Sequence, residues 1–344
     1  MKNIENEIIT SLKNLFEEKH LNIVIVTHEN PDGDAIGSAI GLAEVLRNAG
    51  HDTTVISPND YPSFLKWFGS NVEILVYHHK KKKVKNIMAG SDILICLDFN
   101  EPERAGNIKK QLLLFPKTKI VIDHHPDPSD FADYLFSDTK YSSTAELVFD
   151  ILKEINFKKF INQPAAEAFY TGIMTDTGSF SYGISRPNVF KVASELLTWK
   201  INTEKIHSAT YNNFSKNRMK LLGYCLNKKM EIFPEYRSAV IYISRSELKE
   251  YKFQPGDTEG FVNFPLSIEN IIFSALFIEK KDIIKASFRS KGNFPANRFS
   301  RENFNGGGHL NAAGGESKMT MSKTVEKFKQ LLKDYKHLLS ETKI

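Results

Sequence analysis

Four short apolar segments in the first third of the chain restrict the fold more than any other feature of the sequence. Each contains several β-branched residues, and their nearly continuous apolar character is that of strands buried on both faces of a parallel sheet. The four segments are Asn22–Thr27, Thr53–Ser57, Ile93–Asp98 and Lys119–Asp123. A helical pattern over Ala35–Asn48, ended by Gly50, follows the first of them. This alternation predicts an α/β fold with a doubly wound parallel sheet.

The length of 344 residues favours two domains, because a single hydrophobic core rarely grows beyond ~250–300 residues. We predict one domain over residues 1–200 and a smaller, mixed α/β domain over residues 218–344. The stretch 201–217 between them is polar and weakly patterned, and we assign it to a linker. Strands of the second domain are expected at Ser238–Ser244, Ile271–Glu279 and Ile283–Arg289.

The composition is that of a globular protein, with 41% hydrophobic and 25% charged residues. Its apolar runs are far shorter than the ~20 residues of a membrane-spanning helix, so no membrane partner is expected. Met1–Glu18 mixes acidic with apolar residues, which predicts an amphipathic helix rather than a signal peptide. The two cysteines, Cys96 and Cys225, lie in apolar contexts, which favours a cytoplasmic protein without disulfides.

The net charge of +5 is mildly basic and identifies no partner by itself. The one dense basic run is Lys80–Lys83, which follows His78 and His79. Such a run is most often a solvated surface. The alternative is an electrostatic aid to an anionic substrate.

Acidic and imidazole side chains follow three of the predicted strands, at the edge where open parallel sheets bind their ligands. These residues, together with one later aspartate, are His28, Asp32, Asp34, Asp98, Asp123, His124, His125 and Asp176. An aspartate in such a place is often a helix N-cap, and Asp34 or Asp176 alone could be only that. Several carboxylates at one edge would repel each other unless bound cations offset their charge. The complete set therefore predicts a metal site.

The donor types indicate which metal. Carboxylates with two imidazoles and no thiolate suit Mn²⁺, with Mg²⁺ or Co²⁺ as substitutes, whereas a structural zinc site would contain cysteines. Four aspartates balance two divalent ions and leave a centre that still accepts a phosphate. Two ions ~3.5–4 Å apart activate a bridging hydroxide and stabilise a displacement at phosphorus. We therefore expect two Mn²⁺ and a phosphoesterase.

The order of these residues resembles the four-motif signature of the DHH phosphoesterases. The four motifs here are His28-x3-Asp32-x-Asp34, Asp98, Asp123-His124-His125 and Asp176-Thr177-Gly178. A later segment is similar to the signature of the DHH-associated substrate domain, and it reads Asn305-Gly306-Gly307-Gly308-His309-x2-Ala312-Ala313-Gly314. The resemblance covers nearly the whole chain. Among DHH proteins, the two-domain length most resembles the nano-RNases that also dephosphorylate 3′-phosphoadenosine 5′-phosphate (pAp).

The resemblance implies a role for each residue. One metal would be held by His28, Asp32 and Asp98. The other would be held by Asp34, Asp98, His124 and Asp176, so that Asp98 bridges the pair. His125 would contact the scissile phosphate and stabilise its charge or protonate the leaving oxygen, and Asp123 would orient a ligating imidazole. Arg104, after the second motif, could reach this site or form an ion pair on a helix surface.

The second signature implies a phosphate site formed by Arg289, Gly306, Gly307, Gly308 and His309. Arg grips phosphate through two hydrogen bonds, and we expect the glycine-rich turn to enter a helix whose backbone N–H groups bind the anion. Taken alone, the glycines could be only a flexible turn and Arg289 a surface charge. The family usually has glycine at the position of Asn305, and Asn tolerates the left-handed conformation of such a turn.

These observations predict a Mn²⁺-dependent phosphoesterase with oligoribonuclease and 3′(2′),5′-bisphosphate nucleotidase activity. Its partners would be short RNAs (nanoRNA) and pAp, and a homodimer is compatible with this interpretation. A cyclic di-AMP or pApA phosphodiesterase would use the same residues, whereas a non-catalytic nucleotide-binding module would only keep the fold. Four aromatic residues could serve base stacking or the core: Phe180, Tyr182, Phe294 and Phe299.

Overall fold

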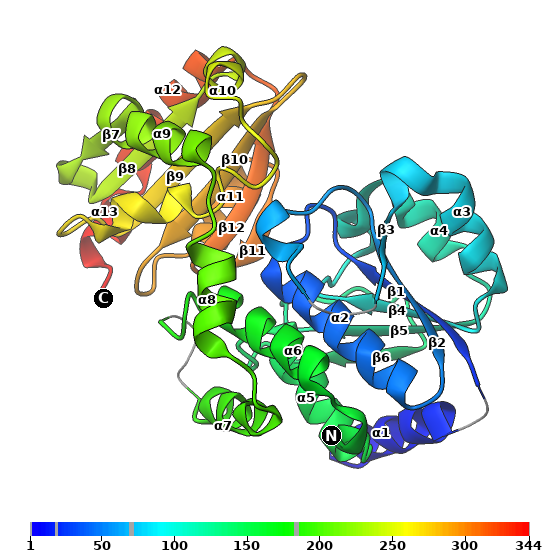
Figure 1. The fold of residues 1–344 in the computed structure, drawn as a ribbon. Helices are drawn as coiled ribbons and strands as arrows, with labels where there is room; N and C mark the ends of the chain where they lie inside the picture. Colours follow the sequence, from blue (N-terminus) through cyan, green and yellow to red (C-terminus); the bar gives the residue numbers. More distant parts are fainter. Residues whose placement is uncertain (1, 18–19, 69–71, 182–185, 344) are drawn as a thin grey trace. The chain divides into compact units, whose positions relative to one another are not determined.

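The structure, a computed structural model, describes residues 2–17, 20–68, 72–181 and 186–343. The chain divides into two units, Met1–Asn213 and Phe214–Ile344 (Figure 1). Their boundary lies inside the segment that we assigned to a linker. Much of that segment is helix α8 (Thr203–Tyr211), whose first turn is capped by the side chain of Asn202.

The first unit is built on a parallel sheet. Its described strands lie in the order β3 (Ile74–Val76), β2 (Asp52–Ser57), β1 (Asn22–Thr27), β4 (Ile93–Leu97), β5 (Thr118–Asp123) and β6 (Tyr134–Ser137). The chain winds outward from the middle of the sheet in both directions, which confirms the predicted doubly wound fold. The two edge strands, β3 and β6, were missed by the sequence analysis because they are short and only partly buried.

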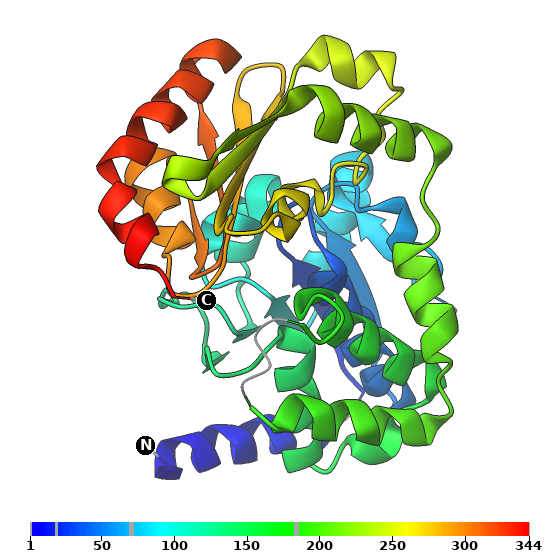
Figure 2. The same ribbon diagram turned by 90° about the vertical axis from the view of Figure 1, so that its left-hand side faces the viewer.

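Helices cover both faces of this sheet (Figures 1 and 2). The helices of the first unit before α8 are α1 (Lys2–Glu17), α2 (Gly33–Asn48), α3 (Tyr77–Gly90), α4 (Lys109–Leu113), α5 (Thr144–Glu154), α6 (Gln163–Asp176) and α7 (Asn188–Leu196). On one face, α1, α2, α5 and α6 pack against alternate residues of β1, such as Ile23 and Ile25. On the other face, α3 and α4 pack against Val24 and Val26. Strand residues are therefore buried on both sides, as their composition predicted.

Helices α2 and α6 pack closely because glycines of α2 face α6. A Cβ atom added at Gly37 would lie 2.6 Å from the carbonyl oxygen of Ala168, so a larger residue would push the helices apart. At one end of this contact, Gly33 begins α2 and lies against Thr175, next to the last residue of α6. The close packing holds Asp34, near the start of α2, beside the C-terminal end of α6.

The second unit contains a mixed sheet. Its described strands lie in the order β11 (Gly307–His309), β12 (Ala312–Ser317), β10 (Ile284–Ser290), β9 (Phe273–Glu279), β8 (Ser238–Ile243) and β7 (Met230–Phe233). The pair β8 and β9 is parallel and the other neighbours are antiparallel. Its helices are α9 (Lys216–Tyr224), α10 (Arg245–Glu250), α11 (Ala296–Asn303), α12 (Met321–Asp334) and α13 (Lys336–Glu341).

The core of the second unit decides the role of two aromatic candidates. Phe294 and Phe299 are fully buried with Phe273 and Phe328, between the sheet and helix α12, so they belong to the core and cannot stack on a base. Phe180 is partly buried against the core of the first unit. Tyr182 lies outside the described residues.

Other features of the sequence also have clear structural explanations. Cys96 and Cys225 are buried free thiols. In the basic run, Lys80 and Lys83 form ion pairs with Glu73 at 3.0 and 3.8 Å, which favours a solvated helix surface over a substrate-binding role. No helix within the described residues has both the length and the apolar character needed to cross a bilayer.

A carboxylate in the second unit makes the stability of this unit depend on pH. Partial burial alone would raise the pKa of Glu247, but hydrogen bonds from Tyr224, from the Ser244 backbone and from Lys229 lower it to about 2. A carboxylate whose pKa is lowered by folding stabilises the folded state at pH values above its ordinary pKa of about 4.5. This stabilisation is lost as the pH falls towards 2. We expect Glu247→Gln to lower unfolding free energy by ~1–2 kcal/mol at pH 7 and by much less at pH 3. Thermal unfolding at both pH values measures this, with Glu250→Gln as the exposed control.

Candidate metal centre

Three neighbouring strands end at the same level of the first sheet. Thr27 of β1 is in register with Leu97 of β4, which is in register with Ile122 of β5. The residues that follow these positions are therefore neighbours across the sheet, and they are His28, Asp98 and Asp123. Parallel strands thus bring residues from distant parts of the sequence to the one edge where such sheets bind ligands.

A first cluster contains His28, Asp32 and Asp98. The Nε2 atom of His28 lies 3.5 Å from a carboxylate oxygen of Asp98 and 4.0 Å from one of Asp32. Its Nδ1 atom is 2.9 Å from the carbonyl oxygen of Glu29, which leaves Nε2 as the lone-pair nitrogen. This Nε2 is buried and makes no hydrogen bond. Ligands of a shared cation lie roughly 3–3.5 Å apart, so a small metal ion fits these atoms with little adjustment.

A second cluster contains Asp34, His124 and Asp176. The Nε2 atom of His124 lies 3.8 Å from Asp34 and 3.4 Å from Asp176, while its Nδ1 lies 3.2 Å from the carbonyl oxygen of Tyr141. The His124 ring is therefore oriented in the same way as that of His28, with Nε2 towards the carboxylates. Asp176 is the last residue of α6.

Asp98 connects the two clusters. One of its oxygens lies 3.6 Å from Nε2 of His124, and the other faces His28. Its backbone has a φ of 66°, in the left-handed region that costs most residues energy. Its side chain accepts a hydrogen bond from the hydroxyl of Thr144 at 2.8 Å. The backbone and Thr144 together hold this carboxylate between the two histidines.

The electrostatics of the clusters favour cations. Burial, and then the charges of Asp98, Asp176 and Asp32, raise the pKa of Asp34 well above its ordinary value. Burial alone would also raise the pKa of Asp98, but the adjacent His28, His125 and His124 hold it well below its ordinary value. Repulsion between buried carboxylates is a cost that a divalent cation would remove. The donor set and its geometry fit two metal ions that share Asp98.

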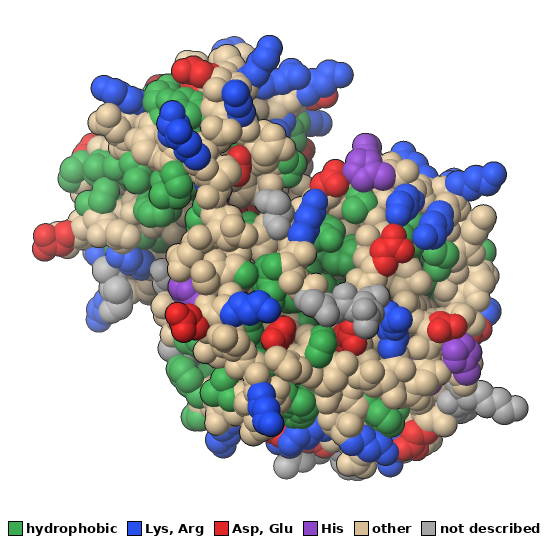
Figure 3. All heavy atoms as spheres, viewed as in Figure 1, with side chains coloured by type: hydrophobic (Ala, Val, Ile, Leu, Met, Phe, Trp, Pro, Cys, Tyr) green, Lys and Arg blue, Asp and Glu red, His purple; other side chains and the backbone are tan. Residues whose placement is uncertain are grey.

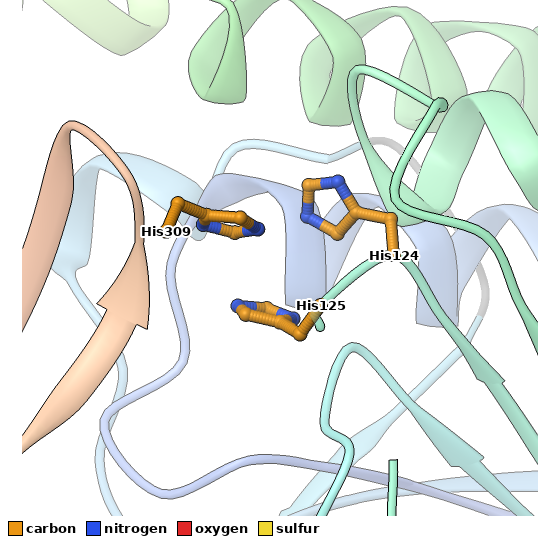
Figure 4. A group of neighbouring side chains, drawn as sticks. All are labelled: His124, His125 and His309. Atoms are coloured by element: carbon orange, nitrogen blue, oxygen red, sulfur yellow. The ribbon is translucent and has the colours of Figure 1, made fainter. Parts of the chain in front are cut away.

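Asp123 contacts His125 rather than the ring of His124. The Nδ1 atom of His125 lies 2.7 Å from one oxygen of Asp123, and the His125 backbone N–H donates to the other at 3.0 Å. Figure 4 shows His124 and His125 leaving the end of β5, their ring planes inclined by 73°. Burial, and then Asp98, raise the pKa of Asp123 to about 6. Asp123 therefore orients the ring of His125, the residue that we expect to contact the phosphate. The contacts do not favour our expectation that Asp123 orients a metal ligand.

This contact predicts the effect of removing the Asp123 charge. We expect Asp123→Asn to lower kcat about 10- to 100-fold, because His125 loses the partner that orients its ring. The affinity for Mn²⁺, measured by calorimetry, should change less than threefold. A large loss of Mn²⁺ affinity with kcat preserved would instead mean that Asp123 supports a metal ligand.

The glycine-rich segment of the second unit is a β-hairpin, so the predicted turn into a helix is wrong. Gly307 to His309 form β11, which pairs with β12 through Ala312 to Gly314. The backbone approaches itself so closely that a Cβ atom at Gly306 would lie 1.9 Å from the carbonyl oxygen of Gly314. Asn305 has a φ of 48°, so it adopts the left-handed conformation that we expected it to tolerate.

The hairpin places two predicted substrate residues on one face of the second sheet. Arg289 of β10 and His309 of β11 are both in register with Ala312 of β12, which lies between them. Residues in register on neighbouring strands point to the same face of the sheet, and neighbouring strands lie ~4.8 Å apart. Arg289 and His309 therefore flank the small side chain of Ala312. Figure 4 shows the ring of His309.

Some contributors to the site were missed by the sequence analysis. Two backbone N–H groups at the start of α5, those of Thr144 and Ala145, donate to the Asp34 carboxylate at 2.6 and 2.9 Å. Ser143 caps this helix and accepts from the backbone of Glu146, so the Ser-x-x-Glu pattern signalled the helix start. The pattern could not show that this helix start faces Asp34, because that is a long-range contact.

Comparison with known proteins identifies the family. Residues 22–173 match the model of the DHH family N-terminal domain, and residues 238–341 match the DHHA1 domain. A crystal structure of an exopolyphosphatase-related protein from Bacteroides fragilis is 41% identical, covers 98% of both chains and superposes with a TM-score of 0.92. The chain belongs to the DHH family. The resemblance inferred from the motifs is thus confirmed.

Curated relatives within this family have named activities. The bifunctional oligoribonuclease and PAP phosphatase NrnA of Bacillus subtilis is 28% identical over 85% of this chain and 88% of its own length. The cyclic-di-AMP phosphodiesterase GdpP of the same organism is 27% identical over 94% of this chain but only 49% of its own length. An exonuclease RecJ bound to manganese shares the fold at 16% identity, with a TM-score of 0.52 over 96% of this chain and 94% of RecJ.

Proposed function

We propose that this DHH phosphoesterase hydrolyses short RNA to nucleoside monophosphates and pAp to AMP and phosphate, with two Mn²⁺ ions. The observation that carries the proposal is the pair of His–carboxylate clusters that share Asp98 at the ends of β1, β4 and β5. The likeness to the NrnA oligoribonuclease over most of both chains supports the substrate class. The complete ligand set favours an enzyme over a non-catalytic nucleotide-binding module.

The metals would be held by the residues that the clusters contain. His28, Asp32 and Asp98 would bind one ion, and Asp34, His124 and Asp176, with Asp98, would bind the other. Two divalent ions supply a hydroxide at neutral pH and offset the charge that builds up on a phosphate. The manganese-bound RecJ with the same fold supports Mn²⁺ as the first ion to test.

His125 and the second unit would act on the substrate itself. Asp123 accepts the Nδ1–H of His125, which leaves Nε2 of that ring to exchange a proton with the leaving oxygen. Burial, followed by the charge of Arg104, lowers the pKa of His125 well below its ordinary value. Arg289 and His309 would bind a phosphate group of the substrate on the face of the second sheet.

A cyclic di-AMP or pApA phosphodiesterase is the second candidate. The partial likeness to GdpP favours it, since the matched half of that protein covers nearly all of this chain. The same clusters would serve this reaction, so the site residues alone do not separate the two candidates.

Product analysis of the purified protein tests the proposal. The protein is incubated with Mn²⁺ and, in parallel, with pAp, a pentaribonucleotide, pApA and cyclic di-AMP. Phosphate from pAp together with mononucleotides from RNA supports the proposal. Turnover confined to cyclic di-AMP and pApA would move the protein to the second candidate, and no turnover of any substrate would contradict both.

A further inference from the structure

A basic cavity lies in the second unit, on strands and helices other than the hairpin with His309. Its volume is about 390 Å³, and it is formed by helix α10, the turn that follows it and the connection between β9 and β10. Five basic side chains line it: Arg245, Lys249, Lys252, Lys280 and Lys281. Figure 3 shows Lys and Arg side chains gathered over the α10 end of this unit.

Most of the positive charge of this cavity is not balanced by carboxylates of its lining. The only carboxylate in the lining is that of Glu279, and it accepts a hydrogen bond from the backbone N–H of Arg245 at 2.8 Å. In the part of the chain that the structure describes, none of the five basic side chains has a carboxylate within ion-pair distance. Desolvation, and then the neighbouring Lys285, lower the pKa of Lys280, as expected where like charges lack a counter-ion.

The charge of the cavity is unusual for this chain. Its lining carries a net charge of +4, whereas the whole chain carries +5. The basic run Lys80–Lys83 differs, because two of its members pair with Glu73. Unpaired cations around one hollow raise the local concentration of anions, whereas paired cations on a helix surface do not.

An aromatic ring in the lining indicates the kind of anion. Phe253 is half-buried at the cavity, and the ammonium group of Lys280 lies 5.0 Å from the centre of its ring. A ring beside lysines is the combination that binds single-stranded nucleic acid, because the ring stacks on a base while the cations contact phosphates. Phe253 packs partly against the core of the second unit, and its remaining surface lies at the cavity. An acidic protein segment would use the cations but would not need an aromatic ring beside them.

We propose that this cavity is a second nucleic-acid site, which binds the phosphodiester backbone and one base of a single-stranded RNA. It is separate from the Arg289 and His309 face, and it would engage nucleotides that are not being hydrolysed. The inference rests on the proposed function only in naming RNA as the polymer.

Salt-dependent binding of RNA tests the cavity directly. The full chain in EDTA is titrated with a fluorescent oligouridylate of about 12 nucleotides, a length within the range that single-strand sites cover. We expect the triple variant Lys249→Gln/Lys252→Gln/Lys281→Gln to weaken binding about 10- to 100-fold at low salt. The slope of log K against log salt should fall by ~2, because each lost phosphate contact contributes ~0.7. Phe253→Leu should weaken binding about tenfold without changing that slope.

A matched variant controls for net charge. Lys81→Gln/Lys82→Gln/Lys85→Gln removes the same charge from exposed positions of α3 and should leave the affinity within threefold. Equal losses in both triple variants would overturn the proposal, since the effect would then be one of overall charge. So would an unchanged affinity in Phe253→Leu, which would mean that the cavity binds polyanions or acidic peptides rather than RNA bases.

The test is independent of the proposed activity, because it measures binding without metal. Loss of RNA binding in the cavity variant of a protein that hydrolyses no RNA would support the cavity and contradict the proposed function. Normal hydrolysis of a pentaribonucleotide, with oligouridylate binding unaffected by the cavity substitutions, would support the proposed function and contradict the cavity.

Discussion

Replacing Asp98 with Asn is expected to reduce turnover of every substrate at least about a thousandfold. This carboxylate lies between His28 and His124 and would be shared by both metals, so its loss removes several kcal/mol of transition-state stabilisation. Asn is a better choice than Ala, because Asp98 has a φ of 66° and Asn tolerates that backbone conformation. Steady-state kinetics in Mn²⁺ would measure the loss, and circular dichroism would show whether the fold is kept.

Asp127→Asn provides the control for the Asp98 variant. Asp127 is also an aspartate at positive φ, of 55°, but it is exposed. It should retain at least half of the native activity. If Asp98→Asn kept both its activity and two bound Mn²⁺ ions, Asp98 would not be the shared ligand.

Removing the metal is expected to destabilise the first unit, and Asp176→Asn should reverse part of that loss. Mn²⁺ at 100 times its Kd should stabilise the protein by ~2.7 kcal/mol per site, which raises Tm by ~10 °C or more for two sites. Without metal, Asp176 adds to the charge that raises the pKa of Asp34, and it also lies at the unfavourable C-terminal end of α6. Its neutralisation should therefore raise Tm in EDTA by ~2–4 °C. The same variant should lose much of the gain that Mn²⁺ gives the native protein.

Glu154→Gln separates the two causes of the Tm increase that we expect for Asp176→Asn in EDTA, namely relief of charge repulsion in the cluster and relief at the helix end. Glu154 is the exposed last residue of helix α5, so it shares the helix-end effect but lies outside the clusters. We expect its Tm in EDTA to rise less than that of Asp176→Asn, and its response to Mn²⁺ to stay native. Differential scanning calorimetry with and without Mn²⁺ measures all three proteins. A native-like response of Asp176→Asn to Mn²⁺ would argue against Asp176 as a ligand.

The site was largely predictable because its residues follow strands. The residues that follow β1, β4 and β5 lie at one edge in any parallel sheet, so His28, Asp98 and Asp123 could be brought together without knowing the packing. The hairpin at Gly307–His309 was not predictable in the same way. Glycines permit both a turn into a helix and a close β-pair, and only the contact with β12 selects the second.

The sequence by itself determined the four central strands of the first sheet (β2, β1, β4 and β5), the order of the acids and imidazoles along it, and the family. These depend on local residue preferences and on chain order, which a single sequence contains. Only the tertiary structure decided that Asp123 serves His125, that the start of α5 holds Asp34, and that cations scattered from Arg245 to Lys281 line one cavity. Each of these is a contact between side chains or backbone groups brought together by folding, and no local preference encodes it.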